Sequence, residues 1–141
     1  MLVDARGVPL SIIVTGANRH DITQLVPTLD AVVVPRPAVH AGTRQHLCAD
    51  AGFVGKQARQ DMIERDYTPH VRPRGEESKA KVQGKRARRW VVEVAHSWFT
   101  RFRKLLVRYE KTDRSYMALN MLAAAMIAFR NVPARVNIIY G

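Results

Sequence analysis

The sequence predicts an α/β fold, in which strands and helices pack as layers around one hydrophobic core. Short β-branched or apolar runs, typical of strands, alternate with segments in which apolar residues recur every three or four positions, typical of helices. The chain has 141 residues, the size of one domain. Hydrophobic residues make up 47% of it, which is too many for a disordered chain.

The first strands are predicted close to the N-terminus. Residues 2–4 resemble the tail of a strand that leads into a hairpin turn at residues 5–7. The β-branched run at residues 11–15 predicts the next strand. Residues 16–20 contain Gly and Asn and are interpreted as a turn.

A helix is predicted to follow this turn. Asp21 fits its start, where the carboxylate would accept hydrogen bonds from exposed backbone amides, and Gln24 would reach back toward the same end. Pro27 is tolerated only in a first turn, so the helix is expected to begin near residue 22 or later. Its buried face would carry Leu25, Leu29 and Val32.

The middle of the chain repeats the order of strand and helix. Residues 46–49 predict a short apolar strand. Residues 56–65 predict a helix with Met62 and Ile63 available for burial. Residues 68–73 contain two prolines, which remove hydrogen-bond donors, so they predict at best a short strand at the edge of a sheet.

Two helices are predicted in the C-terminal half, after a polar, charged loop at residues 75–84. The first, residues 86–110, would be the longest element of the chain. The second, residues 116–129, is largely apolar and is expected to be buried. The apolar stripe of the long helix would consist of Val91, Val94, Trp98, Phe102, Leu105 and Tyr109.

The charge of the chain predicts a polyanionic partner, most simply nucleic acid. The formal net charge is +11, and residues 69–111 alone carry a net charge of +9. Cations and aromatic residues interleave along the long helix, which suits contacts to phosphates and stacking on unpaired bases. The alternatives are a solvated basic face and aromatic residues that pack in the core. The residues concerned are Arg101, Arg103, Lys104 and Arg108, with Trp90, Trp98, Phe99 and Phe102.

The composition disfavours several other classes of protein. Cys48 is the only cysteine, so no internal disulfide forms; we expect a small core residue in a reducing compartment. The N-terminal residues lack a signal-peptide pattern, and the longest uncharged run has 15 residues, fewer than the roughly 20 that span a bilayer. The histidines are scattered without zinc-ligand spacing. A cytoplasmic protein without a membrane partner is therefore expected.

Two carboxylates stand out from this basic background. Asp50 ends the strand at residues 46–49, and α/β folds place ligand-binding groups at the carboxyl ends of strands. Glu93 lies opposite the apolar stripe of the long helix, one turn after Arg89. Converging carboxylates are what two-metal phosphoryl chemistry with Mg²⁺ requires. The alternatives are an Asp50 that only caps the next helix and an ordinary surface pair between Arg89 and Glu93.

The segments around these carboxylates resemble the DDE transposases of bacterial insertion sequences, in the IS-five-like group. Residues 47–53 are similar to the segment around the second catalytic acid of that family. Residues 89–93, followed by residues 97–98, 101–103 and 108–110, resemble the segment around the final glutamate. Residues 3–10, followed by residues 15–21, are similar to a segment between the first and second acids.

The resemblance implies an RNase H-like fold, two Mg²⁺ ions, and DNA cleavage and strand transfer at the ends of a mobile element. Asp50 matches the second metal-binding acid and Glu93 the third, so both are the expected catalytic and metal-binding residues. The residues expected to contact DNA are Arg89, which matches the arginine of the family motif, and Arg101, Arg103, Lys104 and Arg108.

The sequence departs from the family pattern in several places. Arg86 and Thr100 stand where the motif has Tyr and Lys, and Val94 and Ala95 replace a polar or basic pair. The first catalytic Asp of the family lies on a strand upstream of the match to residues 3–10, so Asp4 is not that acid. We therefore interpret residues 1–141 as the C-terminal portion of the catalytic domain. Its RNase H-like sheet would lack the first strand, C-terminal helices would follow, and the N-terminal DNA-recognition region would be absent.

Three functions remain open at this point. The first is metal-dependent DNA transposition, with the isolated chain inactive because the first catalytic Asp is missing. The second is a catalytically inactive remnant that binds DNA or a full-length transposase and regulates transposition. The third is a generic basic RNA-binding domain. The expected partners are thus DNA, another copy of the chain or a full-length transposase, and the expected location is the nucleoid.

Overall fold

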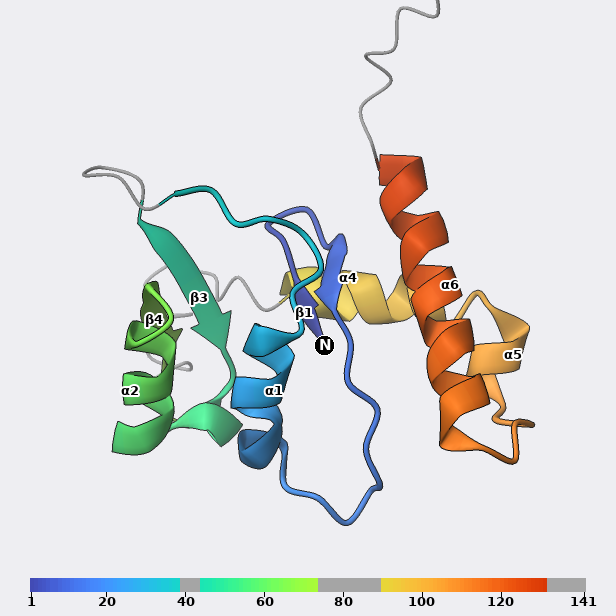
Figure 1. Cartoon of the computed structure of the whole chain (residues 1–141), viewed down its shortest axis with the longest axis horizontal. Helices are drawn as coiled ribbons and strands as arrows, with labels where there is room; N and C mark the ends of the chain where they lie inside the picture. The colour runs from blue at the N-terminus through green and yellow to red at the C-terminus, as the bar shows by residue number, and fades with distance from the viewer. Residues whose placement is uncertain (39–43, 74–89, 132–141) are drawn as a thin grey trace, which may run out of the picture.

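The computed structural model describes residues 1–38, 44–73 and 90–131, and it confirms the mixed α/β class (Figure 1). Strand β1 (Leu2–Val3) pairs antiparallel with β2 (Pro9–Ser11), and β3 (Gln45–Ala49) pairs parallel with β4 (Tyr67–Val71). Within the described residues these pairs form two separate two-stranded sheets. The helices are α1 (Leu25–Asp30), α2 (Lys56–Ile63), α4 (Trp90–Phe99), α5 (Arg103–Leu106) and α6 (Asp113–Asn131).

The predicted N-terminal hairpin is confirmed. One carboxylate oxygen of Asp4 accepts hydrogen bonds from the backbone amides of Arg6 and Val8, each at 2.8 Å, and so holds the turn. Gly7 adopts φ +90°, a left-handed conformation that side chains disfavour. A Cβ at Gly7 would lie 3.4 Å from the backbone oxygen of Val91 and 3.5 Å from the ring of Trp98. The turn therefore lies directly against α4.

The strand predicted at residues 11–15 is wrong in its extent, because β2 ends at Ser11 and residues 12–15 form no strand. The side chains of Ile12 and Val14 are used for packing instead. Ile12 is buried in a cluster with residues of α4 and α6, and the Ser11 hydroxyl donates a hydrogen bond to the backbone oxygen of Thr28 at 2.6 Å. Tertiary contacts therefore determine the conformation of this segment, although its β-branched residues predict a strand.

The helix predicted after the first turn begins differently from the expectation. A 3₁₀ turn, η1 (Asp21–Gln24), precedes α1, and the residue at its N-cap position is His20. The Asp21 carboxylate caps no amide, so the predicted capping role of Asp21 is wrong. Leu25 and Leu29 are buried as predicted, whereas Val32 lies beyond the end of α1.

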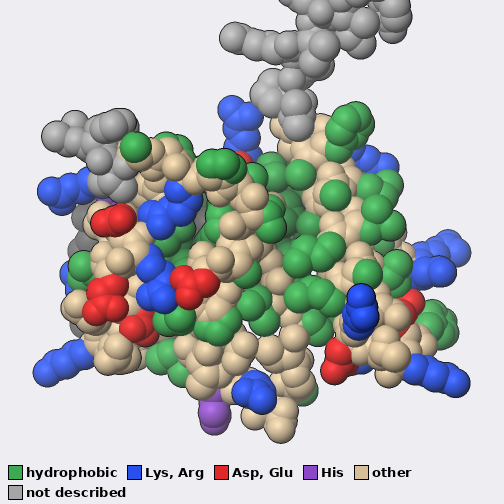
Figure 2. Space-filling model, in the orientation of Figure 1, with side chains coloured by type: hydrophobic (Ala, Val, Ile, Leu, Met, Phe, Trp, Pro, Cys, Tyr) green, Lys and Arg blue, Asp and Glu red, His purple; other side chains and the backbone are tan. Residues whose placement is uncertain are grey.

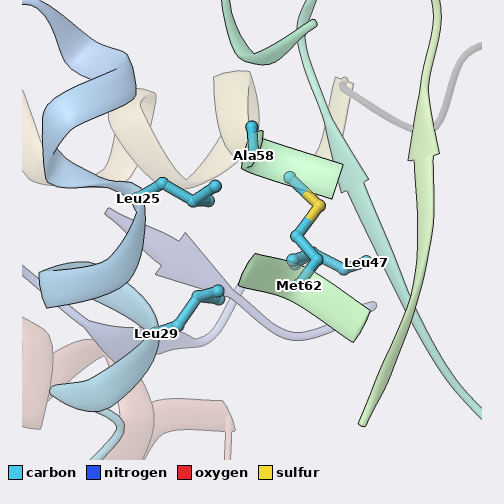
Figure 3. Packing of buried hydrophobic residues seen from close by; sticks show 5 residues of the cluster. All are labelled: Leu25, Leu29, Leu47, Ala58 and Met62. Carbon is cyan, nitrogen blue, oxygen red and sulfur yellow. The ribbon is translucent and has the colours of Figure 1, made fainter. Parts of the chain in front are cut away.

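One hydrophobic core joins α1 and α2 to the parallel sheet. Figure 3 shows its five buried side chains converging, with Met62 fully buried. They are Leu25, Leu29, Leu47, Ala58 and Met62. Outside this core, the guanidinium of Arg65 donates hydrogen bonds to both carboxylate oxygens of Asp30, at 2.6 and 3.1 Å. This pair ties the end of α2 to the end of α1.

The strand predicted at residues 46–49 is confirmed, but the expected burial of Cys48 is wrong. Alternate residues of a strand point to opposite faces, and β3 turns Leu47 to the core while His46 and Cys48 are exposed. Pro69 is tolerated in β4 because this strand has only β3 as a partner within the described sheet.

The continuous helix predicted for residues 86–110 is wrong. Residues 86–89 lie outside the described part of the chain, α4 ends at Phe99, and Phe102 adopts an extended conformation before α5. This turn lets Phe102 and Leu105 pack on a second core cluster. Tyr109, the last residue of the predicted stripe, lies beyond the end of α5, outside any helix, and is 75% exposed.

Helix α6 confirms the last predicted helix, but only one of its sides is buried. Ala123 and Ile127 pack with Ile12 and Phe99, whereas Leu122 and Phe129 on the other side are 58% and 81% exposed. The expected burial of the whole helix is therefore wrong. Among the described helices, none is long and apolar enough to cross a membrane.

Candidate functional site

A cavity of about 540 Å³ lies where the N-terminal hairpin, α1, the end of β3 and α4 meet. Leucine and valine side chains form much of its wall, including Leu2, Leu47 and Val92. Its polar lining brings together two groups that the sequence predicted and two that it did not. These are Asp50 and Glu93, and Asp21 and His96.

Asp50 is positioned by the turn that follows β3. It occupies the N-cap position of a short 3₁₀ turn, η2 (Ala51–Phe53), and one of its carboxylate oxygens accepts a hydrogen bond from the Gly52 amide at 2.8 Å. A Cβ at residue 52 would lie 3.0 Å from that oxygen, so glycine permits this close approach. Asp50 therefore has the capping role that was weighed as an alternative, and its side chain also lines the cavity.

Glu93 reaches the same cavity from a helix. It is exposed on α4, together with His96 and Ser97, while Val91 and Ala95 on the other side are buried. This confirms the polar face that the sequence predicted. Among the described residues, no hydrogen bond or ion pair involves the Glu93 carboxylate, and its possible pair with Arg89 lies outside them.

Two basic groups, the Met1 ammonium and the His96 imidazole, lie at the cavity with the carboxylates. Desolvation by burial lowers the pKa of the Met1 ammonium, and the negative charge of nearby Asp21 opposes this shift. His96 is exposed overall, but desolvation of the imidazole beside the cavity lowers its pKa, and the charge of the Met1 ammonium adds to the effect. Asp21 and His96 were missed as site residues. Only their position in the fold identifies them, because a helix-start Asp and a scattered His carry no site motif.

The lowered pKa of His96 predicts a pH dependence of stability. The unfolded chain binds a proton at this residue more readily than the folded chain, so the free energy of unfolding should fall as pH drops below about 6.5. The substitution His96→Gln is expected to flatten this part of the curve, measured by urea unfolding between about pH 7.5 and pH 5. An NMR titration in which His96 has a pKa at or above about 6.5 would contradict the assignment.

The donor set of the cavity suits a hard divalent cation in type and falls short in number. Carboxylate oxygens are the ligands that Mg²⁺ prefers, and Asp50 and Glu93 supply them. In the described residues, however, no group of three or more His, Cys, Asp or Glu side chains is placed to hold a metal ion. The described part of the chain therefore supplies two carboxylates of the kind that a hard cation binds, and no complete ligand set.

The predicted DNA-binding residues that the structure describes follow the C-terminal end of α4 in the chain and do not line the cavity. Arg101 follows α4, and Arg103 and Lys104 lie on α5; all three side chains are exposed. Arg108 forms an ion pair with Asp113 and lies over the ring of Tyr116, 5.0 Å from its centroid. Arg89 lies outside the described residues.

The sequence left two roles open for the aromatic residues, core packing and stacking on bases, and the structure divides them between the two. Phe99 is buried, and Trp98 and Phe102 pack partly buried against the second cluster, as core packing requires. Trp90 is 56% exposed and is therefore available for stacking.

Comparison with known proteins identifies the family. Residues 47–130, which include both carboxylates, match the family model described as Transposase DDE domain. The chain is 32% identical over 139 residues to a putative transposase for insertion sequence element IS402 from Burkholderia cepacia, and the alignment covers 94% of this chain and 62% of that protein. No solved structure matches the chain significantly. The match over most of the chain shows that this protein belongs to the DDE transposase family.

Proposed function

We propose that this chain contributes to DNA transposition, with Asp50 and Glu93 as metal-binding residues of the catalytic centre. The observation that supports this most directly is that both carboxylates line one cavity, one from a strand end and one from a helix face. The proposed reaction is the metal-dependent cleavage and strand transfer of DNA at the ends of an insertion sequence. The DDE family in general depends on divalent metal ions, and two Mg²⁺ ions are proposed here.

Each carboxylate would have a defined task. The Gly52 amide fixes one oxygen of Asp50, which leaves the second oxygen to contact a cation. Glu93 lines the same cavity from another element, and we propose that the two side chains hold a cation between them. When bound, the ions would neutralise charge on the attacked phosphate and activate the attacking oxygen. Arg101, Arg103 and Lys104 would steady the DNA backbone, as would Arg89 and Arg108.

The two small sheets support an RNase H-like arrangement with one further strand. Residues of β1 and β3 line the same cavity, yet the two strands belong to separate sheets in the described residues. A strand placed between them would join the sheets and cover their unpaired backbone groups. In the proposed complete centre, this strand would carry the third carboxylate, as the resemblance to the family implies.

The metal assignment is tested by direct binding of Mn²⁺, followed by electron paramagnetic resonance. Asp50→Asn and Glu93→Gln should each weaken binding, because each removes a charged oxygen ligand. Glu64→Gln, an exposed carboxylate on α2's C-terminal side, is the matched control and should leave binding unchanged. Equal binding by all three variants would refute the assignment.

The proposed DNA contacts predict a strong salt dependence. Each phosphate neutralised contributes a slope of about 0.9 in log K against log salt, so affinity should fall steeply as salt rises. Replacing Arg101, Arg103 and Lys104 with Ala should lower both the affinity and the slope in fluorescence-anisotropy titrations. Lys56→Ala with Arg59→Ala, at exposed cations of α2, is the matched control. A flat salt dependence would contradict the proposal, and stronger binding to RNA than to DNA would favour the basic RNA-binding alternative.

A second candidate function is a regulator that binds DNA or a full-length transposase without catalysis. The observation that favours it is the absence, from the described residues, of a third side chain placed to complete a metal site. Such a protein would retain the DNA affinity described above and inhibit strand transfer by the complete enzyme. Either function would place the protein on DNA, at the nucleoid in the cytoplasm.

A further inference from the structure

Helix α6 carries a second apolar face that no described element covers. Its first face packs on α4, α5 and β2 through residues such as Ala123 and Ile127. The second face exposes Leu122, Met126 and Phe129, at spacings of four and three residues, and Met121 is exposed next to Leu122. A helix that is apolar on all sides is normally buried. An exposed apolar face of this kind marks an interaction site.

This face borders a groove of about 250 Å³ between α5 and α6. The inner lining is apolar and at least partly buried, with Phe102, Leu105 and Ala123 among its residues. Leu122 and Met126 form an exposed edge on α6, and Arg103 and Lys104 line the groove from α5. Figure 2 shows hydrophobic side chains gathered along α6, with Lys and Arg at the outer edge.

The charge around the groove indicates which partner fits it. Arg103 and Lys104 line the groove, and none of the described residues that line it is an Asp or Glu. We propose that the groove between α5 and α6 binds an amphipathic helix of a partner protein, whose apolar stripe enters the groove and whose flanks are acidic. The apolar residues supply most of the affinity, and Arg103 and Lys104 select the acidic flanks. The same two cations are proposed above to contact DNA, so the partner helix and DNA would compete for them.

Two other occupants fit the surface less well. A second copy of the chain would bring Arg103 and Lys104 of both grooves together, and their like charges oppose association. A membrane surface favours a convex apolar stripe that inserts among lipids, whereas this site is a groove between two helices. Both remain measurable outcomes of the test below.

The test is fluorescence anisotropy with a designed helical peptide and the full 141-residue chain. The peptide carries Leu and Phe at positions i, i+3, i+4 and i+7, with Glu on both flanks. Leu122→Ser combined with Met126→Ser is expected to weaken its binding about tenfold or more, because the apolar anchors lose their contacts. Val33→Ser, at another exposed apolar residue that does not line the groove, is the matched control. Circular dichroism verifies that each variant is folded.

The charge preference is tested with a second peptide, in which every flanking Glu is replaced by Lys. The Glu peptide should bind more tightly, and Arg103→Ala with Lys104→Ala should reduce this preference. Equal binding of the two peptides, or no effect of the Leu122 and Met126 substitutions, would overturn the proposal. So would a dimer in sedimentation analysis that these substitutions dissociate, or binding to anionic lipid vesicles without binding to the peptide. None of these outcomes depends on metal binding at Asp50 and Glu93.

Discussion

The 141-residue chain is expected to show no strand transfer on an oligonucleotide substrate in the presence of Mg²⁺ or Mn²⁺. Two carboxylates hold a metal loosely, whereas two ions in line with the attacked phosphate require a third acid. The described residues contain no such set of three. A transposase that also contains the strand with the family's first catalytic Asp should carry out strand transfer. In that protein, Glu93→Gln should reduce the rate by roughly three orders of magnitude or more.

Cleavage by the purified 141-residue chain that Glu93→Gln abolishes would contradict this expectation. It would mean that one of the chain's own acids completes the site. Asp21 is then the residue to test, because it lines the cavity with Asp50 and Glu93. Asp4 is the matched control, since its carboxylate accepts hydrogen bonds from Arg6 and Val8 in the hairpin. In that case Asp21→Asn should abolish the cleavage. Asp4→Asn, the control, alters only the hydrogen bonds of the hairpin.

The substitution Met62→Ala is expected to lower the free energy of unfolding by about 2–5 kcal/mol. Met62 is fully buried among Leu25, Leu47 and the other residues of the first core, so its truncation leaves a cavity that the neighbours fill only in part. Domains of this size are stable by about 5–15 kcal/mol, so the loss is a large fraction of the total. Two-stranded sheets add little stability of their own, which makes this core the more important.

Urea unfolding followed by circular dichroism measures this effect. Ile63→Ala is the matched control, because Ile63 is the next residue of α2 and is 46% exposed. Its loss should cost much less than that of Met62. Similar costs for the two substitutions would show that α2 does not turn Met62 toward the core.

The sequence by itself predicted two carboxylates as candidate site residues and most of the elements around them. The strand of residues 46–49 and the polar face of Glu93 follow from local patterns, since strands alternate every second residue and helices repeat every 3.6. The resemblance at residues 47–53 and 89–93 predicted the family, which the match over residues 47–130 confirms. These features are local in sequence, so they were available before any tertiary structure.

Only the tertiary structure decided how distant segments share one space. It ended the long helix at Phe99, because Phe102 and Leu105 gain burial on the second core when the chain turns. It also brought Asp21 and His96 to the cavity that contains Asp50 and Glu93, and it left one face of α6 exposed. Periodicity shows which residues share a face of an element. Which faces meet depends on packing between segments far apart in the chain, and no local pattern records that.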